Sequence, residues 1–334
     1  MNKAKTSTKL RRFMERNKKS HGYLLRKTIG RFFFQTLRAM LLFGLCFLII
    51  QPIFNKISIS FMAEKDLYDA TVISIPRNFT LENYKLVSHL INFPKALRNT
   101  IFMSLVVSIL QVTSCTLVGY GFARFKFPFK RFWFACVILV IVIPPQTIMS
   151  PLYLHFRYFD VLGIFKAITG NTLNLLNTTA PYLMLVTGCM GLKSGLYIFM
   201  IRQYFRGVPK DLEEAAYVDG CGKVKTFIKV MLPDAKPIIT SCFLFAYVWQ
   251  WTDSFYSNLF LRHITLLPSG LRSISERLAD YFEVAFGIGN LPTIGYTQGL
   301  ISTGMLMAIL PLILIYLVAQ KGFVESLSQT GIKM

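Results

Sequence analysis

Six apolar runs, separated by more polar segments of varied length, recur along this sequence of 334 residues. Each run has about 20 residues, the length that an α-helix needs to cross a hydrocarbon core roughly 30 Å thick. Hydrophobic residues make up 53% of the chain, more than a soluble core of this size requires. The sequence therefore predicts an all-α integral membrane protein with six transmembrane helices, over residues 36–57, 99–122, 132–154, 181–204, 238–260 and 299–319.

The formal net charge of +21 first suggests a nucleic-acid partner. The basic residues, however, flank the apolar runs and do not alternate with aromatic residues on a polar surface. Residues 1–38 hold twelve Lys and Arg against one acid, and residues 123–131 hold four and no acid. By the positive-inside rule both segments are predicted to be cytoplasmic, and six spans then place both termini in the cytoplasm. We expect no nucleic-acid partner, and we expect contact with membrane lipid.

These spans predict the following organisation: a basic cytoplasmic segment (1–35), a first transmembrane helix (36–57), an extracytoplasmic segment (58–98), a transmembrane domain of five helices (99–320) and a cytoplasmic tail (321–334). Pro144 and Pro145 fall inside the third run and should kink or interrupt it, because proline removes a helical hydrogen bond. Such a break needs protein or water to satisfy the freed carbonyls, so we expect it to face the bundle interior or a cavity. It serves either as a hinge or as a packing irregularity.

The sequence predicts no catalytic or metal-binding chemistry on this chain. The six cysteines form no CxxC pair, and the four histidines are scattered. No G-x-x-x-x-G-K-[ST] sequence is present, and no pair of carboxylates or Ser/His/Asp set stands out. We therefore expect no catalytic residues, no metal site and no cofactor on this chain.

A polar island at residues 211–237 interrupts the apolar pattern. Acids at its start favour a helix N-terminus, and Gly220 can take the left-handed conformation that ends a helix. A second, basic helix is predicted over residues 223–232 and should stop at Pro233. Three interpretations remain at this point: a loop that only covers the membrane face, a helix-turn-helix that binds DNA, and a docking element for another protein. Spans on both sides make access to a DNA groove poor.

This island resembles the EAA signature of the membrane subunits of binding-protein-dependent ABC importers. The resemblance rests on Glu214-Ala215-Ala216, Gly220 and the closing Val230-Met231-Leu232-Pro233 with their spacing. In that family the loop is a coupling helix that inserts into a cleft of a cytoplasmic ATPase. The resemblance implies a cytoplasmic two-helix EAA coupling loop over about residues 206–236, with these coupling residues: Glu214, Ala215, Ala216, Asp219, Gly220, Leu232 and Pro233.

Three further stretches are similar to the same family. They are Asn99-Thr100 with the Gly-Phe-Ala-Arg that closes that run, Leu267-Pro268-Ser269-Gly270-Leu271, and the C-terminal Gln320-Lys321-Gly322-Phe323. The last two are typical of the carbohydrate (maltose-type) branch and its second permease. The resemblance covers residues 99–334. It implies a bacterial plasma-membrane permease paired with a homologous second permease, two ATP-binding cassette subunits that bind ATP and Mg, and an extracytoplasmic solute-binding protein.

The fifth run carries polar and aromatic side chains at a depth where polar groups are costly against lipid. Aromatic faces can stack on the C–H faces of a sugar, while amide and carboxylate groups can bind its hydroxyls. We therefore predict a sugar or oligosaccharide pathway at Tyr247, Trp249, Gln250, Trp251 and Asp253. An aromatic belt at the membrane interface is the alternative, chiefly for Phe255 and Tyr256.

A channel or secondary transporter that does not use ATP is the rival function. Secondary transporters often carry ion-coupling carboxylates within their spans, and here only Asp253 qualifies. That scarcity favours the importer.

Overall fold

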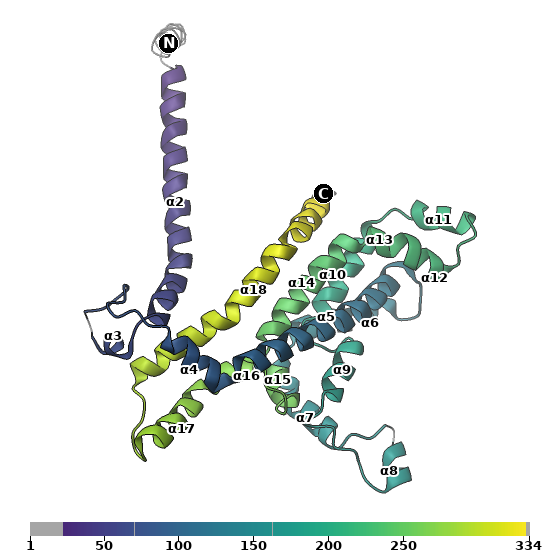
Figure 1. The fold of residues 1–334 in the computed structure, drawn as a ribbon. Helices are drawn as coiled ribbons and strands as arrows, with labels where there is room; N and C mark the ends of the chain where they lie inside the picture. The colour runs from purple at the N-terminus through teal and green to yellow at the C-terminus, as the bar shows by residue number, and fades with distance from the viewer. Residues whose placement is uncertain (1–22, 70, 162, 332–334) are drawn as a thin grey trace.

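A computed structural model describes residues 23–69, 71–161 and 163–331. Most of the basic segment predicted at residues 1–35, and the last three residues of the tail, lie outside this range. The described chain is mostly helical (Figure 1). Four helices are long: α2 (Tyr23–Ser60), α5 (Phe93–Arg124), α14 (Lys236–Thr252) and α18 (Ile294–Gly331).

Shorter helices connect and flank the long ones. Those before the polar island are α3 (Glu64–Tyr68), α4 (Glu82–Ile91), α6 (Lys130–Val142), η1 (Pro145–Ile148), α7 (Met149–Arg157), α8 (Ile164–Thr169), α9 (Ala180–Thr187) and α10 (Ser194–Gly207). The island and the segments after it contain α11 (Asp211–Val218), α12 (Lys223–Thr226), the π-helical η2 (Phe227–Met231), α13 (Leu232–Asp234), α15 (Phe255–Phe260), α16 (Leu267–Arg272) and α17 (Ile274–Phe286).

Within the described residues, three helices are long and apolar enough to cross a membrane by themselves: Ile29–Ser60, Phe93–Arg124 and Ile294–Val318. A fourth crossing is obtained if Lys130–Val142 and Pro145–Arg157, which meet at a bend of 101°, count as one broken span. The predicted runs at 181–204 and 238–260 are divided into shorter helices. The chain is thus a multi-helix membrane protein with three continuous candidate crossings and one bent helix pair that can serve as a fourth.

The predicted break at Pro144 and Pro145 is confirmed, because α6 ends at Val142 and the chain turns sharply there. Pro144 is exposed on the surface of this chain, so the described residues do not cover it. That the break faces the bundle interior or a cavity stays a prediction.

A second break, between α9 and α10, has no proline at its centre. Cys189 and Lys193 take positive φ angles of 59° and 63° there. Gln111 of α5 holds the turn, since its Nε2 donates to the Leu192 carbonyl (2.6 Å) and to Ser194 Oγ (2.8 Å). Contacts from a neighbouring helix thus stabilise the break between α9 and α10, which no local sequence pattern predicts.

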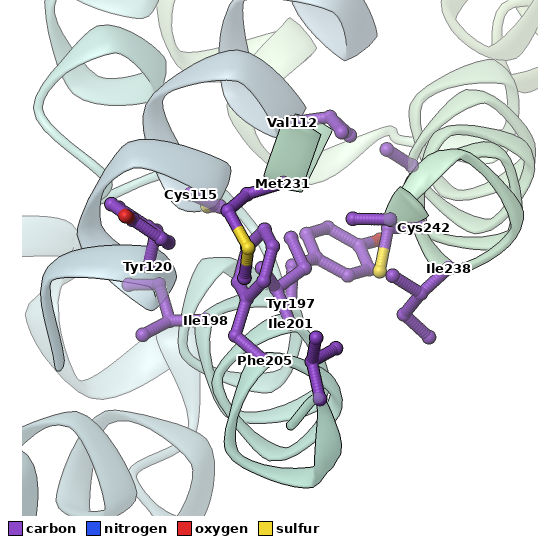
Figure 2. Packing of buried hydrophobic residues seen from close by; sticks show 13 residues of the cluster. Val112, Cys115, Tyr120, Tyr197, Ile198, Ile201, Phe205, Met231, Ile238 and Cys242 are labelled. Atoms are coloured by element: carbon purple, nitrogen blue, oxygen red, sulfur yellow. The ribbon is translucent and has the colours of Figure 1, made fainter. Parts of the chain in front are cut away.

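The main core lies between α5, α10 and α14, and Figure 2 shows side chains from all three converging. Met231 of η2 also points into this cluster, beside Phe205 and Tyr197. These three side chains are fully buried. The polar island is therefore joined directly to the packed centre of the molecule.

Helix α2 stands apart from this core and contacts α18 (Figure 1). None of the apolar window of its span is buried in the chain. The start of α2, the end of α18 and α11–α12 lie on one side of the molecule, whereas α3, α8 and α17 lie on the other (Figure 1). The polar island and both ends of the described chain thus share one side.

Candidate functional site

Helix α11 ends in a complete Schellman motif. Gly220 has φ +78°, the left-handed conformation expected from the sequence. Its N–H donates to the Tyr217 carbonyl (3.0 Å), and the Cys221 N–H donates to the Ala216 carbonyl (2.9 Å). This pair of bonds satisfies the last carbonyls of a helix and fixes the direction of the chain beyond it.

Glu213 anchors α11 to α5. Its Oε1 accepts a hydrogen bond from the Tyr120 hydroxyl (2.9 Å) and lies 3.3 Å from Arg124 Nε. Arg124 also donates to the Val208 carbonyl (2.8 Å), just before α11. All three groups are largely withdrawn from solvent, so the ion pair is weakly screened and each partner depends on the other. This arrangement fixes α11 at the end of α5.

The predicted coupling residues of α11 divide between two faces. Ala216 is buried against the chain, and Glu214, Ala215, Asp219 and Gly220 are exposed. Apolar side chains lie exposed on the same segment, led by Val218, which is 87% exposed; the others are Leu212, Tyr217, Val224 and Ile228. Exposed apolar groups beside polar ones are the pattern of a protein-docking surface.

The second helix of the island does not stop at Pro233, as the sequence predicted. It continues through the π-helical η2 and α13 to Asp234, and α14 starts at Lys236. The widened turn before Pro233 relaxes the hydrogen-bond pattern that a proline interrupts. Tyr204 of α10 donates to the Asp234 carbonyl (2.6 Å) and clamps this junction. The island is thus connected rigidly to α14.

Leu232 and Pro233 line an apolar groove of about 670 Å³ between α5 and α14. Next to them along the chain, Met231 and Ala235 are fully buried in the core. A displacement of the island would therefore act on α5 and α14 together.

The five candidate pathway residues, four on α14 and Asp253 just after it, have different environments. Tyr247 and Trp251 are packed in the core, and Trp251 Nε1 donates to the Ala308 carbonyl of α18 (3.1 Å). Gln250 accepts a hydrogen bond from the buried Tyr182 hydroxyl. Only Trp249, 47% exposed, presents its ring on the surface of this chain.

Asp253 lies in the break between α14 and α15. Its carboxylate accepts hydrogen bonds from the backbone N–H groups of Phe255 (2.9 Å), Tyr256 (3.3 Å) and Ser257 (3.1 Å), and from Ser257 Oγ (3.1 Å). An acid that accepts the free N–H groups at the start of a helix caps that helix. Asp253 is 6% exposed and is thus satisfied by its own chain.

Lys193 lies against Trp249. Its Nζ is 4.9 Å from the centre of the indole ring, within the range of a cation–π interaction. Lys193 is exposed and occupies the positive-φ position that starts α10. The break between α9 and α10 therefore places a cation beside the exposed tryptophan of α14.

Among the residues that the structure describes, no group of three or more His, Cys, Asp or Glu side chains could hold a metal ion.

Comparison with known proteins identifies the class of this molecule. The sequence profile of the family described as "Binding-protein-dependent transport system inner membrane component" matches residues 115–324, well over half of the chain. The chain belongs to this family. It is a membrane component of a binding-protein-dependent transport system, and this assignment disfavours the channel and secondary-transporter alternative.

Relatives of this transport component cover most of its length. A probable ABC transporter permease protein of Pyrococcus horikoshii is 28% identical over 75% of this chain and 81% of the relative. An arabinooligosaccharides transport system permease protein of Halalkalibacterium halodurans is 26% identical over 86% and 93%. A trehalose transport system permease protein of Mycobacterium tuberculosis is 25% identical over 78% and 84%.

The fold of the permease is also found in a solved structure. A chain from a bacterial ABC transporter involved in the import of the acidic polysaccharide alginate superposes with a TM-score of 0.67. The two chains are 22% identical, and the match covers 86% of this chain and 95% of that one. The helical arrangement of this chain is therefore the fold of that ABC importer chain.

Sequence reasoning missed four residues that shape these sites: Glu213, Tyr120, Arg124 and Lys193. The acids of the island were recognised only as favourable for a helix start, and no local signal separates Glu213 from Glu214. For Arg124, the available signal was a charged residue directly after an apolar run. Lys193 and Arg202 are the cations inside the predicted run at residues 181–204, and a cation within a transmembrane run was the available signal for Lys193.

Proposed function

We propose that this permease forms half of the translocation pathway of an ATP-driven sugar or oligosaccharide importer. The names of its relatives support a carbohydrate substrate, since they transport arabinooligosaccharides and trehalose. The proposed assembly contains a homologous second permease, two ATPases that bind ATP and Mg, and an extracytoplasmic solute-binding protein. ATP hydrolysis then takes place on the partner, and this chain has no catalytic site.

The observation that carries the proposal is the exposed apolar surface of α11 and α12, which is held in place by contacts with α5. Val218 and its neighbours are available to a partner, and Glu213 holds α11 to α5. We propose that this segment is the EAA coupling loop, with Glu214, Ala215, Ala216, Asp219 and Gly220 at the ATPase. Closure of the ATPase dimer would move α11, and η2 with Leu232 and Pro233 would pass the movement to α5 and α14.

Six crossings with both termini in the cytoplasm are the topology that we propose. Three crossings are continuous, and three are broken: α6 with α7, α9 with α10, and α14 with α15. This topology is supported by the position of α11, which lies on the same side of the molecule as the start of α2 and the end of α18 (Figure 1). The basic residues of the loop between α5 and α6 favour the cytoplasm for the same side.

For the substrate, we propose direct contact at Trp249, on the exposed stripe of α14. An indole face suits the C–H face of a sugar ring, and Lys193 beside it can donate to hydroxyls. The buried Tyr247, Gln250, Trp251 and Asp253 remain candidate pathway residues that become available only if α14 moves. Their contacts otherwise hold α14 against α9, α15 and α18.

Purification of the tagged chain in a mild detergent, followed by identification of the proteins that accompany it, tests the proposal. We expect a second permease and an ATPase, and a Val218→Asp variant should lose the ATPase while it keeps the second permease. Recovery of this chain alone, or only as a homo-oligomer, in several detergents would reject the importer. The solute-binding protein of the assembly can then be screened against oligosaccharides.

A further inference from the structure

A second site lies away from the pathway, at the end of the bundle that adjoins α11. A cavity of about 600 Å³ opens there between α5, α6 and α10. Four of its lining side chains are cations and none is an acid: Lys130, Arg131, Arg202 and Arg206. Its other walls are apolar and include Phe122 and Phe134. The cavity thus combines concentrated positive charge with a hydrophobic surface.

Arg202 makes a close contact with an aromatic wall of the cavity. Its guanidinium carbon lies 3.6 Å from the centre of the Phe134 ring of α6, within the range of a cation–π interaction. Its Nε is enclosed and has no hydrogen-bond partner among the described residues, and its Nη1 reaches only Gln203 (3.4 Å). A planar guanidinium held in this way keeps donors available for an oxyanion.

The charge of this cavity has no counterion in the described chain. The described chain has two ion pairs, Arg77 with Asp69 and Arg124 with Glu213, and neither involves a cavity residue. Lys130 donates to the Phe125 carbonyl (2.7 Å), a neutral group. Like charges that share one cavity repel each other unless an anion lies between them.

We propose that this cavity binds a phosphate group. Phosphate oxygens suit arginine donors, which form charge-assisted and often bidentate hydrogen bonds. Basic pockets between transmembrane helices on the cytoplasmic side bind phosphate-bearing lipid headgroups, and the apolar walls here suit an acyl chain. A free phosphate compound shares the headgroup chemistry. The site itself goes beyond the proposed transport function, although its cytoplasmic position rests on the proposed topology.

A bound phosphate would act on the proposed coupling segment, residues 206–236. Arg202 and Arg206 lie on α10, which ends at Gly207 shortly before α11 begins. An anionic lipid at this site ties the end of α10 to the membrane leaflet. The position of the coupling segment would then depend on lipid composition.

Native mass spectrometry of the purified importer, offered equal phosphatidylglycerol and phosphatidylcholine, tests the site. We expect selective retention of phosphatidylglycerol, and an Arg202→Gln/Arg206→Gln variant should retain it about tenfold less, since each lost charge-assisted bond weakens binding substantially. The Arg131→Gln/Arg206→Gln pair changes two exposed cations, spares the stack on Phe134, and should also lose retention. Lys126→Gln and Lys229→Gln alter exposed cations outside the cavity and serve as controls.

Inorganic phosphate distinguishes the two sources of the phosphate group. If millimolar phosphate raises the melting temperature of the lipid-free importer, and both paired variants abolish this effect, the site takes a soluble phosphate compound. If only phosphatidylglycerol binds, the ligand is a lipid headgroup. Equal retention of phosphatidylglycerol by both paired variants and both controls, with no effect of phosphate, would overturn the proposal. Each readout is independent of transport, so failure here leaves the proposed function intact.

Discussion

Glu213 and Glu214 are neighbours in the sequence with different environments. Glu213 is buried against Tyr120 and Arg124, whereas Glu214 is exposed on α11. We expect Glu213→Gln to lower the stability of the permease by about 1–3 kcal/mol, because Arg124 loses its charged partner in a poorly solvated place. The melting temperature of the isolated permease measures this loss.

Glu214→Gln is the matched control for that experiment. It should leave the melting temperature unchanged, since Glu214 has no ion pair within the described chain. Its expected effect is weaker retention of the ATPase during purification. Equal losses of stability in both variants would show that Glu213 is not the anchor of α11.

At the scale of elements, the junction of α14 and α15 holds a helix-capping residue, Asp253, close to the proposed substrate contact, Trp249. Asp253 caps α15 through three backbone N–H groups, so Asp253→Ala should lower the melting temperature, with a cost of about 0.5–2 kcal/mol. Trp249→Ala removes an exposed ring and should raise the KM of uptake, while the stability stays close to that of the wild type. If Asp253→Ala changes the KM and Trp249→Ala does not, the substrate contacts the helix break and not Trp249.

The sequence predicted elements where the signal is local. The helical class, the break at Pro144 and the left-handed Gly220 are confirmed, because apolar length, proline and glycine act on the chain nearby. The break before Lys193 could not be predicted, since Gln111, far away in the sequence, stabilises it. The continuation past Pro233 was also missed, because it depends on a π-helical turn and on Tyr204 from another helix.

The candidate site was predicted less completely than the fold. A motif fixes which residues belong to α11, but it does not show which of them face the partner and which face α5. Burial of Tyr247 and Trp251 likewise depends on α18, whose packing no local pattern reveals. The sequence therefore predicted which residues belong to the site, but not which way their side chains face.

At the scale of the whole molecule, the proposed topology makes opposite predictions for two positions. Cys221 lies in the proposed coupling segment, and Ser74 is exposed in the segment between α3 and α4. In single-cysteine variants, a maleimide that cannot cross membranes should label Ser74→Cys in intact cells and Cys221 only in inside-out vesicles. Labelling of both positions from the same side would contradict the topology.

Two glycines of the coupling segment provide the most direct test of ATPase coupling. Gly220 has φ +78°, whereas Gly222 has φ −74°, and neither has another atom within 4 Å of an added Cβ. A β-branched residue at Gly220 is strained by at least about 1–2 kcal/mol and should displace the end of α11, whereas Gly222 can accept it.

The decisive measurement is the ratio of ATP hydrolysed to substrate taken up by proteoliposomes of the complete importer. We predict that Gly220→Val hydrolyses ATP with little or no uptake, and that Gly222→Val keeps the ratio of the wild type. Both variants should insert into the membrane in normal amounts. Normal coupled uptake by Gly220→Val would contradict the central claim that α11 transmits the movement of the ATPase.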